Sequence, residues 1–404
     1  MSSTTHTETS KFSLSMLIND TRYRSTTFQV IALIGLIFAM GYLVSNLLSN
    51  LADAGLNISW RFFGETAGYD INQMPIEYDN QMSHGRASLV GAVNTLIVAF
   101  LACVSATVLG VIAGVLRLSN NWVVSKLMAI YVEAFRNVPV LVWILIIFLV
   151  MSNVLPQPRE FRGDAAASSM WFDMVAFTNR GVYIPRMIMG DLSWFVVGTF
   201  ALSIAGVFVF RRYARHLLFS TGRLIPTVLP SIGILIIPTV VAYLLLGRPI
   251  GLEYPVLKGF NFSGGLHLRL SLIALWFALA IYTGAFIAEN VRAGIQAISH
   301  GQTEAAAALG MRPGRIMSLI ILPQALRVIV PPLISQYLNI TKNSSLAIAV
   351  GYMDITGTLG GITLNQTGRA IECILVLMLF YLVISLSISA IMNVYNNAMK
   401  LKER

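Results

Sequence analysis

Long apolar segments recur along this chain, and most of them are long enough to cross a membrane. A helix needs about 20 apolar residues to span the hydrocarbon core of a bilayer. Eight segments approach or exceed that length, at residues 28–49, 88–116, 139–154, 194–210, 224–246, 270–288, 328–352 and 370–394. Only 11% of the residues are charged and the mean hydropathy is +0.72. We therefore expect an all-α polytopic membrane protein with about eight transmembrane helices.

The distribution of charge predicts the orientation. With a cytoplasmic N-terminus, the inside segments are 1–27, 117–138, 211–223, 289–327 and 395–404. They hold 17 Lys and Arg and six acids, whereas the outside segments hold ten cations and eleven acids. Cytoplasmic loops are enriched in Lys and Arg, so this bias predicts an N-in, C-in topology. It also explains the net charge of +10 better than nucleic-acid binding does.

The first apolar segment has two possible interpretations. Small residues at 52–54 resemble the cleavage site of a signal peptide. However, the apolar run of 28–49 exceeds a typical signal core, and a long segment precedes it. We expect a retained membrane anchor, with residues 1–27 as a cytoplasmic tail.

The seventh segment contains polar residues that a membrane helix rarely carries. It includes two adjacent prolines and the cluster Asn339, Thr341, Lys342, Asn343, Ser344 and Ser345. Prolines inside a helix leave carbonyls without partners, and charges at membrane depth often mark transport pathways. We expect this helix to line a pathway. The alternative is that Lys342 extends to the outer interface.

A second polar stretch, "YVEAFRNVPVLVW" at 131–143, precedes the third apolar run, which Pro139 is expected to start. Glu133 and Arg136 are three residues apart, so they could pair on one helix face. We expect that ion pair at the inner interface; gating or substrate contact is the alternative.

The stretch "SHGQTEAAAALGMRP" interrupts the apolar pattern in the predicted cytoplasmic segment 289–327. Ser299 and Gln302 have the spacing of a capping box, and alanine has the highest helix propensity. Gly310 suits the left-handed position that ends a helix, and Pro313 prevents its continuation. We expect a short helix at about 300–312. Its alanine face and Glu304 favour a docking surface for a partner over an incidental connecting helix.

The same region carries the resemblance to a known family. Glu304-Ala305-Ala306, Gly310, Ile320 and Leu322-Pro323 match in type and spacing the EAA signature of the membrane subunits of ABC importers. The segment "IAENVRAGIQAISHGQTEAA" is similar to that of the polar amino acid permeases, as are "YVEAFRNVPVLV" and "PPLISQYLNITKNSSLAI". Two pairs of residues differ from the family pattern: Asn137-Val138 replace Gly-Thr, and Asn343-Ser344 replace Asp-Thr.

The resemblance covers the five core helices, which implies a type I ABC importer permease core. The expected organisation has core parts at 88–154 and 267–396, an extra first helix and outside loop at 28–87, an insertion with two further helices at 155–266, and a tail at 397–404. This extended form resembles the long general L-amino acid permeases of Gram-negative bacteria.

The resemblance implies an inner-membrane subunit that translocates L-amino acids, with broad specificity, by alternating access. The implied partners are two copies of a cytosolic ABC ATPase, a second permease subunit (expected to be a paralogue), a periplasmic amino acid-binding protein and membrane lipid. The implied ATPase-coupling residues are Gln302, Glu304, Ala305, Ala306, Gly310 and Arg312. The substrate-path candidates are Lys342, Asn343, Ser344, Ser345, Glu133 and Glu289.

Several activities are excluded or disfavoured. No glycine precedes any lysine, so the chain has no P-loop, and ATP and Mg would be used by the partner ATPase. Two separated cysteines and scattered histidines predict no metal site. An ion-gradient-driven secondary transporter is the alternative function, but it would need buried carboxylates, and only Glu372 falls within an apolar segment. A membrane hydrolase lacks candidate catalytic pairs.

Overall fold

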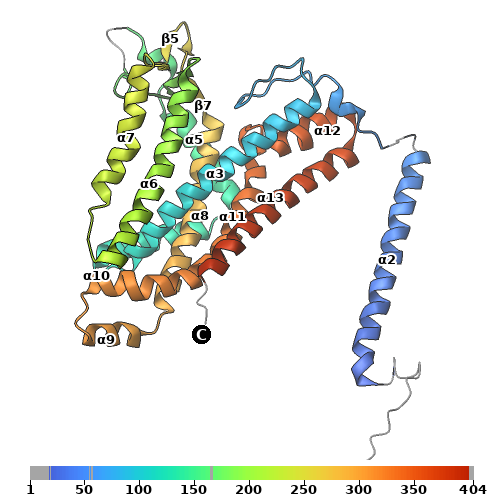
Figure 1. The fold of residues 1–404 in the computed structure, drawn as a ribbon. Helices are drawn as coiled ribbons and strands as arrows, with labels where there is room; N and C mark the ends of the chain where they lie inside the picture. Colours follow the sequence, from blue (N-terminus) through green and yellow to red (C-terminus); the bar gives the residue numbers. More distant parts are fainter. Residues whose placement is uncertain (1–17, 19, 54, 56–57, 164–166, 400–404) are drawn as a thin grey trace, which may run out of the picture. The chain divides into compact units, whose positions relative to one another are not determined.

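The computed structural model describes residues 18, 20–53, 55, 58–163 and 167–399. The chain divides into two units, Met1–Trp60 and Arg61–Arg404, which are described separately. The described part of the first contains one long helix, α2 (Thr21–Asp53; Figure 1). Its central apolar side chains are exposed. The helix is long and apolar enough to span a membrane, which agrees with the expected first span.

The described residues contain seven helices suited to crossing a membrane, or eight when one bent pair counts as a span. This confirms the expected polytopic class. The bent pair consists of α4 (Trp122–Arg136) and α5 (Val140–Val154), which meet at 106°. Pro139 stands at the N-cap of α5, so the proline begins the apolar run as expected. The bend explains why the third apolar segment is short.

Two closely packed helices, α3 (His84–Arg117) and α8 (Leu270–Gln296), form the centre of the second unit. Gly110 and Gly114 of α3 allow this approach. A Cβ at Gly110 would lie 2.5 Å from the Cβ of Ile287, and one at Gly114 would lie 2.6 Å from the Ala288 carbonyl oxygen. Small residues commonly permit such contacts between membrane helices. The main core includes Ala102, Ala106, Leu275, Leu279 and Ile287.

The C-terminal part of the core begins with the short helix α9 (His300–Ala308), visible in Figure 1 beyond the end of α8. The chain continues as α10 (Pro313–Ile316), a π-helical turn η3 (Met317–Ile321) and α11 (Leu322–Asn343). It then forms the 3₁₀ segment η4 (Ser344–Val350), the π segment η5 (Thr356–Thr363), α12 (Leu364–Thr367) and α13 (Ala370–Met399). Pro331 and Pro332 lie inside α11 without ending it. The irregular backbone occurs further along, from Ser344.

The region between α5 and α8 contains the helical pair α6 (Ser193–Thr221) and α7 (Val228–Leu245). The described residues of this region also form seven short strands, which the all-α expectation did not include. They are β1 (Ala176–Thr178), β2 (Gly181–Ile184), β3 (Arg186–Met189), β4 (Ile250–Glu253), β5 (Val256–Lys258), β6 (Asn261–Ser263) and β7 (Leu266–Arg269).

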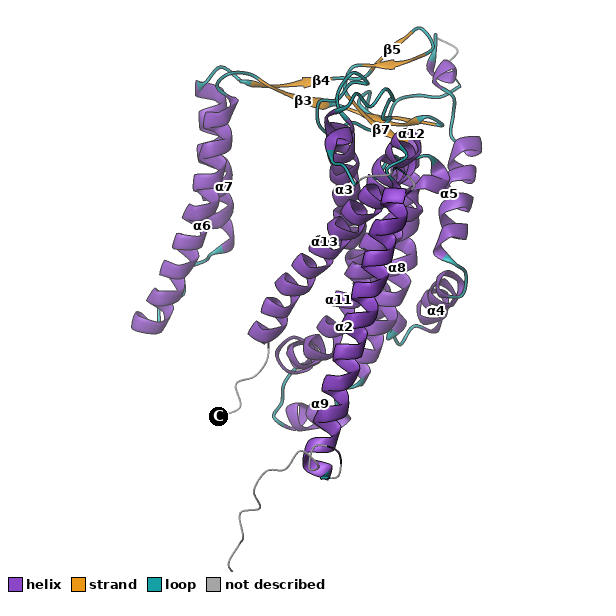
Figure 2. Ribbon diagram, turned by 90° about the vertical axis from the view of Figure 1, so that its right-hand side faces the viewer, coloured by secondary structure: helices purple, strands orange, loops and turns teal. Residues whose placement is uncertain are grey.

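All strand pairings are antiparallel: β1-β2-β7 form one sheet, and β3-β4 and β5-β6 form two ribbons. Figure 2 shows α6 and α7 as a pair that the β3-β4 ribbon joins to the rest of this unit. The strands lie between helices that can span a membrane. Open sheet edges are tolerated there because water can satisfy the exposed backbone groups. Two single-turn helices, η1 (Arg61–Gly64) and η2 (Pro158–Phe161), complete the fold.

Candidate functional site

Helix α9 ends as its sequence predicts. Gly310 has φ = +75°, a conformation that side chains other than glycine seldom adopt. Its amide donates to the Ala307 carbonyl at 2.9 Å, and the Met311 amide donates to the Ala306 carbonyl at 3.2 Å. These two bonds form a Schellman motif. The motif fixes the direction in which the chain leaves α9.

The start of α9 differs from the predicted capping box. Ser299 occupies the N-cap, but its side chain makes no capping hydrogen bond. The Gln302 amide donates instead to the Ser299 backbone carbonyl at 3.0 Å. An exposed helix end can satisfy its remaining donors with water, so the side-chain cap is dispensable. Glu304 pairs with His300, one turn before it, at 3.0 Å between Nδ1 and Oε1.

One alanine attaches α9 to the core. Ala306 is 2% exposed and packs with Ile316 and Ile321. Four of the other predicted coupling residues have exposed side chains: Gln302, Glu304, Ala305 and Arg312. The helix thus has an inward anchor and an outward surface that contains polar and small side chains.

An ionic cluster joins three helices near the start of the connection to α9. The carboxylate of Glu289 in α8 accepts hydrogen bonds from Arg117 of α3 and from Nε of Arg292, the latter at 3.1 and 3.2 Å. Arg117 also lies 3.7 Å from the carboxylate of Glu133 in α4. We call Arg117, Glu133, Glu289 and Arg292 the ionic bracket.

The predicted ion pair between Glu133 and Arg136 is wrong. The Arg136 guanidinium lies over the ring of Phe286, 5.2 Å from its centroid. Glu133 instead faces Arg117, which arrives from another helix. A long-range partner therefore replaces the expected neighbour, because α3 brings a cation to the face on which Glu133 lies.

The other predicted path residues lie around the end of α11, near η4. Lys342 is exposed and has no ion-pair partner among the described residues. Ser344 is fully buried, and its hydroxyl donates to the Thr341 carbonyl at 2.7 Å. The Ser345 hydroxyl donates to the Lys342 carbonyl at 2.7 Å. Asn343, the last residue of α11, is half-buried.

The structure does not bring these residues to the ionic bracket. The bracket joins α3, α4 and α8, whereas Lys342 lies at the far end of a 22-residue helix that starts near α9. At 1.5 Å per residue, that helix separates its two ends by roughly 30 Å.

A buried carboxyl group was not among the sequence candidates. Asp354 is 0% exposed, and its Oδ1 accepts a hydrogen bond from the Gly357 amide at 2.8 Å. Burial raises the pKa of this carboxyl to about 6. Nearby, Asn94 of α3 donates to the Met353 carbonyl at 2.9 Å, and Thr95 accepts from the Ile355 amide at 3.1 Å. A lone acid in the Gly- and Thr-rich stretch 353–363 was the available signal.

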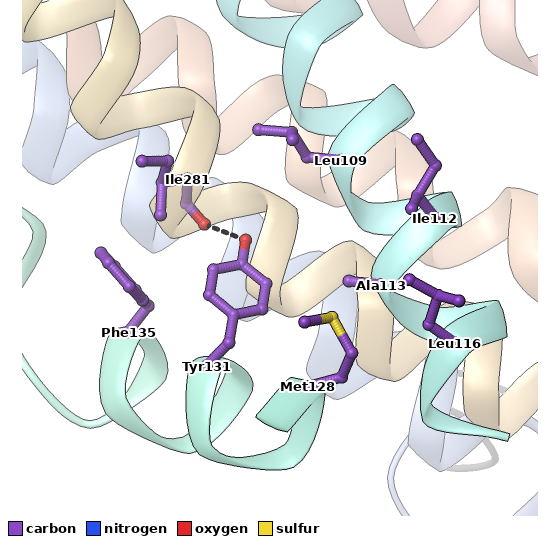
Figure 3. A pocket seen from close by; sticks show the side chains of 8 residues that line it. All are labelled: Leu109, Ile112, Ala113, Leu116, Met128, Tyr131, Phe135 and Ile281. Atoms are coloured by element: carbon purple, nitrogen blue, oxygen red, sulfur yellow. Dashed lines mark hydrogen bonds between the residues drawn. The ribbon is translucent and has the colours of Figure 1, made fainter. Parts of the chain in front are cut away.

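Several cavities occur beside the core helices in the described part of the chain, and two of them lie against α8. The first, about 400 Å³, lies among α3, α4 and α8 and has apolar walls (Figure 3). The Tyr131 hydroxyl in this wall donates to the Ile281 carbonyl at 2.7 Å. The second, about 380 Å³, lies among α3, α8, α11 and α13. It contains the hydroxyls of Thr107 and Tyr337, which are 2.7 Å apart. The described residues contain no group of ligands suited to a metal ion.

Known proteins share long stretches with this chain. The family described as "Binding-protein-dependent transport system inner membrane component" matches residues 216–401. The glutamate/glutamine/aspartate/asparagine transport system permease protein BztB of Rhodobacter capsulatus is 51% identical over 417 residues, covering 97% of each chain.

Two further relatives match over most of their length. The putative amino-acid ABC transporter permease protein YhdX of Escherichia coli is 43% identical and covers 94% of this chain and 95% of its own. The general L-amino acid transport system permease protein AapQ of Rhizobium johnstonii is 39% identical and covers 95% and 94%. A crystal structure of an amino acid ABC transporter with histidines aligns at a TM-score of 0.45 and 20% identity, over 78% of this chain and 95% of that one.

Proposed function

This chain belongs to the family of binding-protein-dependent transport system inner membrane components, and we propose that it carries polar L-amino acids across the membrane. Movement of helix α9 is proposed to open and close the transport path. It is a multi-pass permease subunit of an amino acid ABC importer in the inner membrane. The permease does not itself hydrolyse ATP. An ABC permease works with an ATPase and a binding protein.

The proposed substrates are polar L-amino acids, with glutamate, glutamine, aspartate and asparagine first among them. The support is that one relative matching nearly the whole chain is named for these four, and another for general L-amino acids. The proposed assembly has two ATPase copies, a second permease subunit that is a paralogue, and a periplasmic binding protein.

The proposed coupling surface comprises Gln302, Glu304, Ala305 and Arg312, with Ala306 and Gly310 fixing its position. The single observation that carries this proposal is the two-sided character of α9. Ala306 is buried against the core, while its neighbour Ala305 is exposed. An ATPase that grips the exposed side would move α9 and the attached core together.

The ionic bracket is proposed to transmit that movement. Helix α8 leads directly into α9, and Glu289 ties α8 to Arg117 of α3. Charged hydrogen bonds of this kind are stronger than neutral ones. Glu133 and Glu289 therefore have a mechanical role at the inner mouth, rather than direct contact with substrate.

The proposed path passes the polar end of α11. Lys342, Asn343, Ser344 and Ser345 follow one another where regular helix gives way to 3₁₀ structure, and irregular polar backbone inside a membrane protein commonly lines a pathway. The hydroxyls of Thr107 and Tyr337 lie in a cavity among the core helices and are proposed to face the same path. When the two ATPases bind ATP and close, the path would open to the outside. ATP hydrolysis would reverse this change.

The function is tested by uptake into proteoliposomes that contain the complete importer. We expect labelled glutamate to enter only when the binding protein is outside and ATP has access to the ATPase. The Glu304→Lys variant should lose uptake and ATPase association. Glu77→Lys, a matched reversal of an exposed acid in the predicted outside segment, should keep both. Full uptake without ATP would contradict the proposal.

A further inference from the structure

The end of α6 that is predicted to be cytoplasmic is strongly basic and has no acidic partner among the described residues. Arg211, Arg212, Arg215 and His216 lie in its last turns, and Arg223 follows the helix. No acid occurs in the sequence between Asp191 and Glu253. Within the described ranges, these cations make no ion pair. We call this group the basic patch of α6.

The basic patch surrounds a shallow hollow that aromatic residues flank. The hollow measures about 740 Å³, and its walls include Arg211, Arg212, Arg215, Phe208 and Phe219. Residues three and four apart share one helix face, so the arginines and both rings form a continuous stripe. Phe208 is 71% exposed and Phe219 is 81% exposed.

Most of the patch is not needed to hold the helical pair together. Helix α6 packs against α7, and a Cβ added at Gly206 would lie 3.2 Å from Cγ2 of Ile234. Arg211 contributes to this contact, because its Nε donates to the Ser231 hydroxyl at 3.3 Å. Arg212 and Arg215 are exposed and make no such bond within the described chain. Their guanidinium groups remain free to bind an anion.

We propose that the basic patch of α6 binds the phosphate headgroups of acidic phospholipids in the inner leaflet. The helix carrying it is apolar enough to span the membrane, so in the predicted topology the patch lies where a span meets the cytoplasmic surface. Arginine clusters immediately cytoplasmic to a span attract anionic lipids, and exposed aromatic rings are typical of the membrane interface.

The rings favour a lipid over an acidic protein surface. Phe208 and Phe219 offer large apolar faces next to the arginines. A lipid satisfies both groups at once, because its phosphate meets the guanidinium groups and its acyl chains cover the rings. The α6–α7 pair would then anchor this part of the permease to acidic lipid while the coupled core moves.

The test is lipid retention by the purified full-length importer, measured by native mass spectrometry with added phosphatidylglycerol or phosphatidylcholine. We expect phosphatidylglycerol to be retained preferentially. The double variant R212Q/R215Q should weaken this binding by about 25-fold, taking about fivefold for each cation near an anionic surface. R212K/R215K keeps the charge and should retain most of the binding.

Lys126→Gln is the matched control, since Lys126 is an exposed cation in another predicted inside segment, on α4. It should bind lipid as the unmodified protein does. Equal retention by R212Q/R215Q would overturn the proposal. Displacement of the lipid by equimolar inorganic phosphate would also overturn it. The same holds if R212Q/R215Q keeps the lipid but loses the ATPase subunit. If the double variant fails to fold, R212Q alone decides, with about a fivefold loss expected. Lipid retention and ATPase association are measured separately, so failure of this proposal is distinguishable from failure of the role proposed for α9.

Discussion

Arg117 and Glu289, separated by 172 positions in the sequence, form an ion pair that joins the last residue of α3 to α8. The pair lies shortly before the chain enters α9. Because Glu289 also binds Arg292, one carboxylate pairs with two partly buried guanidinium groups. A change at this residue should therefore affect both stability and coupling.

Replacing Glu289 by Gln should destabilise the permease by about 1–3 kcal/mol, because two charged donors lose their anionic acceptor. Glu133→Gln is the control. Its side chain is 59% exposed and lies 3.7 Å from Arg117, so it should cost less than about 1 kcal/mol. Unfolding in detergent checks both variants. Equal losses of unfolding free energy in the two variants would show that Glu289 is not the centre of the ionic bracket.

Gly310→Val should strain the end of α9, because a β-branched residue is forced into the left-handed region at a cost of about 1–2 kcal/mol. We expect reduced amino acid uptake per ATP hydrolysed. Nothing lies within 4 Å of an added Cβ, so the effect is conformational. Gly310→Asn, which tolerates this conformation better, should keep most of the coupling. Normal coupled uptake in Gly310→Val would contradict the motif's role.

Two neighbouring alanines should respond differently to enlargement. Ala306→Leu should overpack the contact with Ile316 and Ile321 and destabilise the protein by about 1–3 kcal/mol. Ala305→Leu places the same side chain on the exposed side, so stability should persist while ATPase association falls. Thermal unfolding and co-purification separate the two effects. The opposite pattern would reverse the proposed inward and outward faces.

Asp354 should make stability depend on pH. Its folded pKa is raised from 3.8 to about 6 by burial, so the native state binds its proton more tightly than the unfolded state. The stabilisation is complete below the unfolded pKa and is lost as pH rises through the folded pKa. We expect the melting temperature to fall between about pH 4 and 6 from this group. Asp354→Asn should remove that component, and an unchanged pH profile would refute the assignment.

Local signals in the sequence predicted much of the fold. Apolar length located the spans, and Gly310 located the end of α9 because its conformation depends on few neighbours. The alanine run also predicted a short helix, although the side-chain cap at Ser299 did not form. Local chemistry is sufficient where the structure depends on adjacent residues.

Long-range contacts could not be predicted in the same way. Glu133 has a plausible partner three residues away, yet Arg117 reaches it from another helix. Asp354 looks like an ordinary loop acid, and only the packing of Asn94, Thr95 and Gly357 around its segment shows that it is buried. The strands also depend on pairing between distant segments, as in β2 with β7.

The most direct test of the account asks what touches the exposed side of α9. A photo-crosslinking amino acid at position 305 should capture the ATPase subunit in membranes that contain the assembled importer. The same photo-crosslinking amino acid in place of Phe100, an exposed residue in the membrane-spanning part of α3, should not capture the ATPase. Efficient capture of the ATPase from position 305 alone is the predicted result. A crosslink from position 305 to no nucleotide-hydrolysing protein would contradict the claim that α9 couples this permease to ATP.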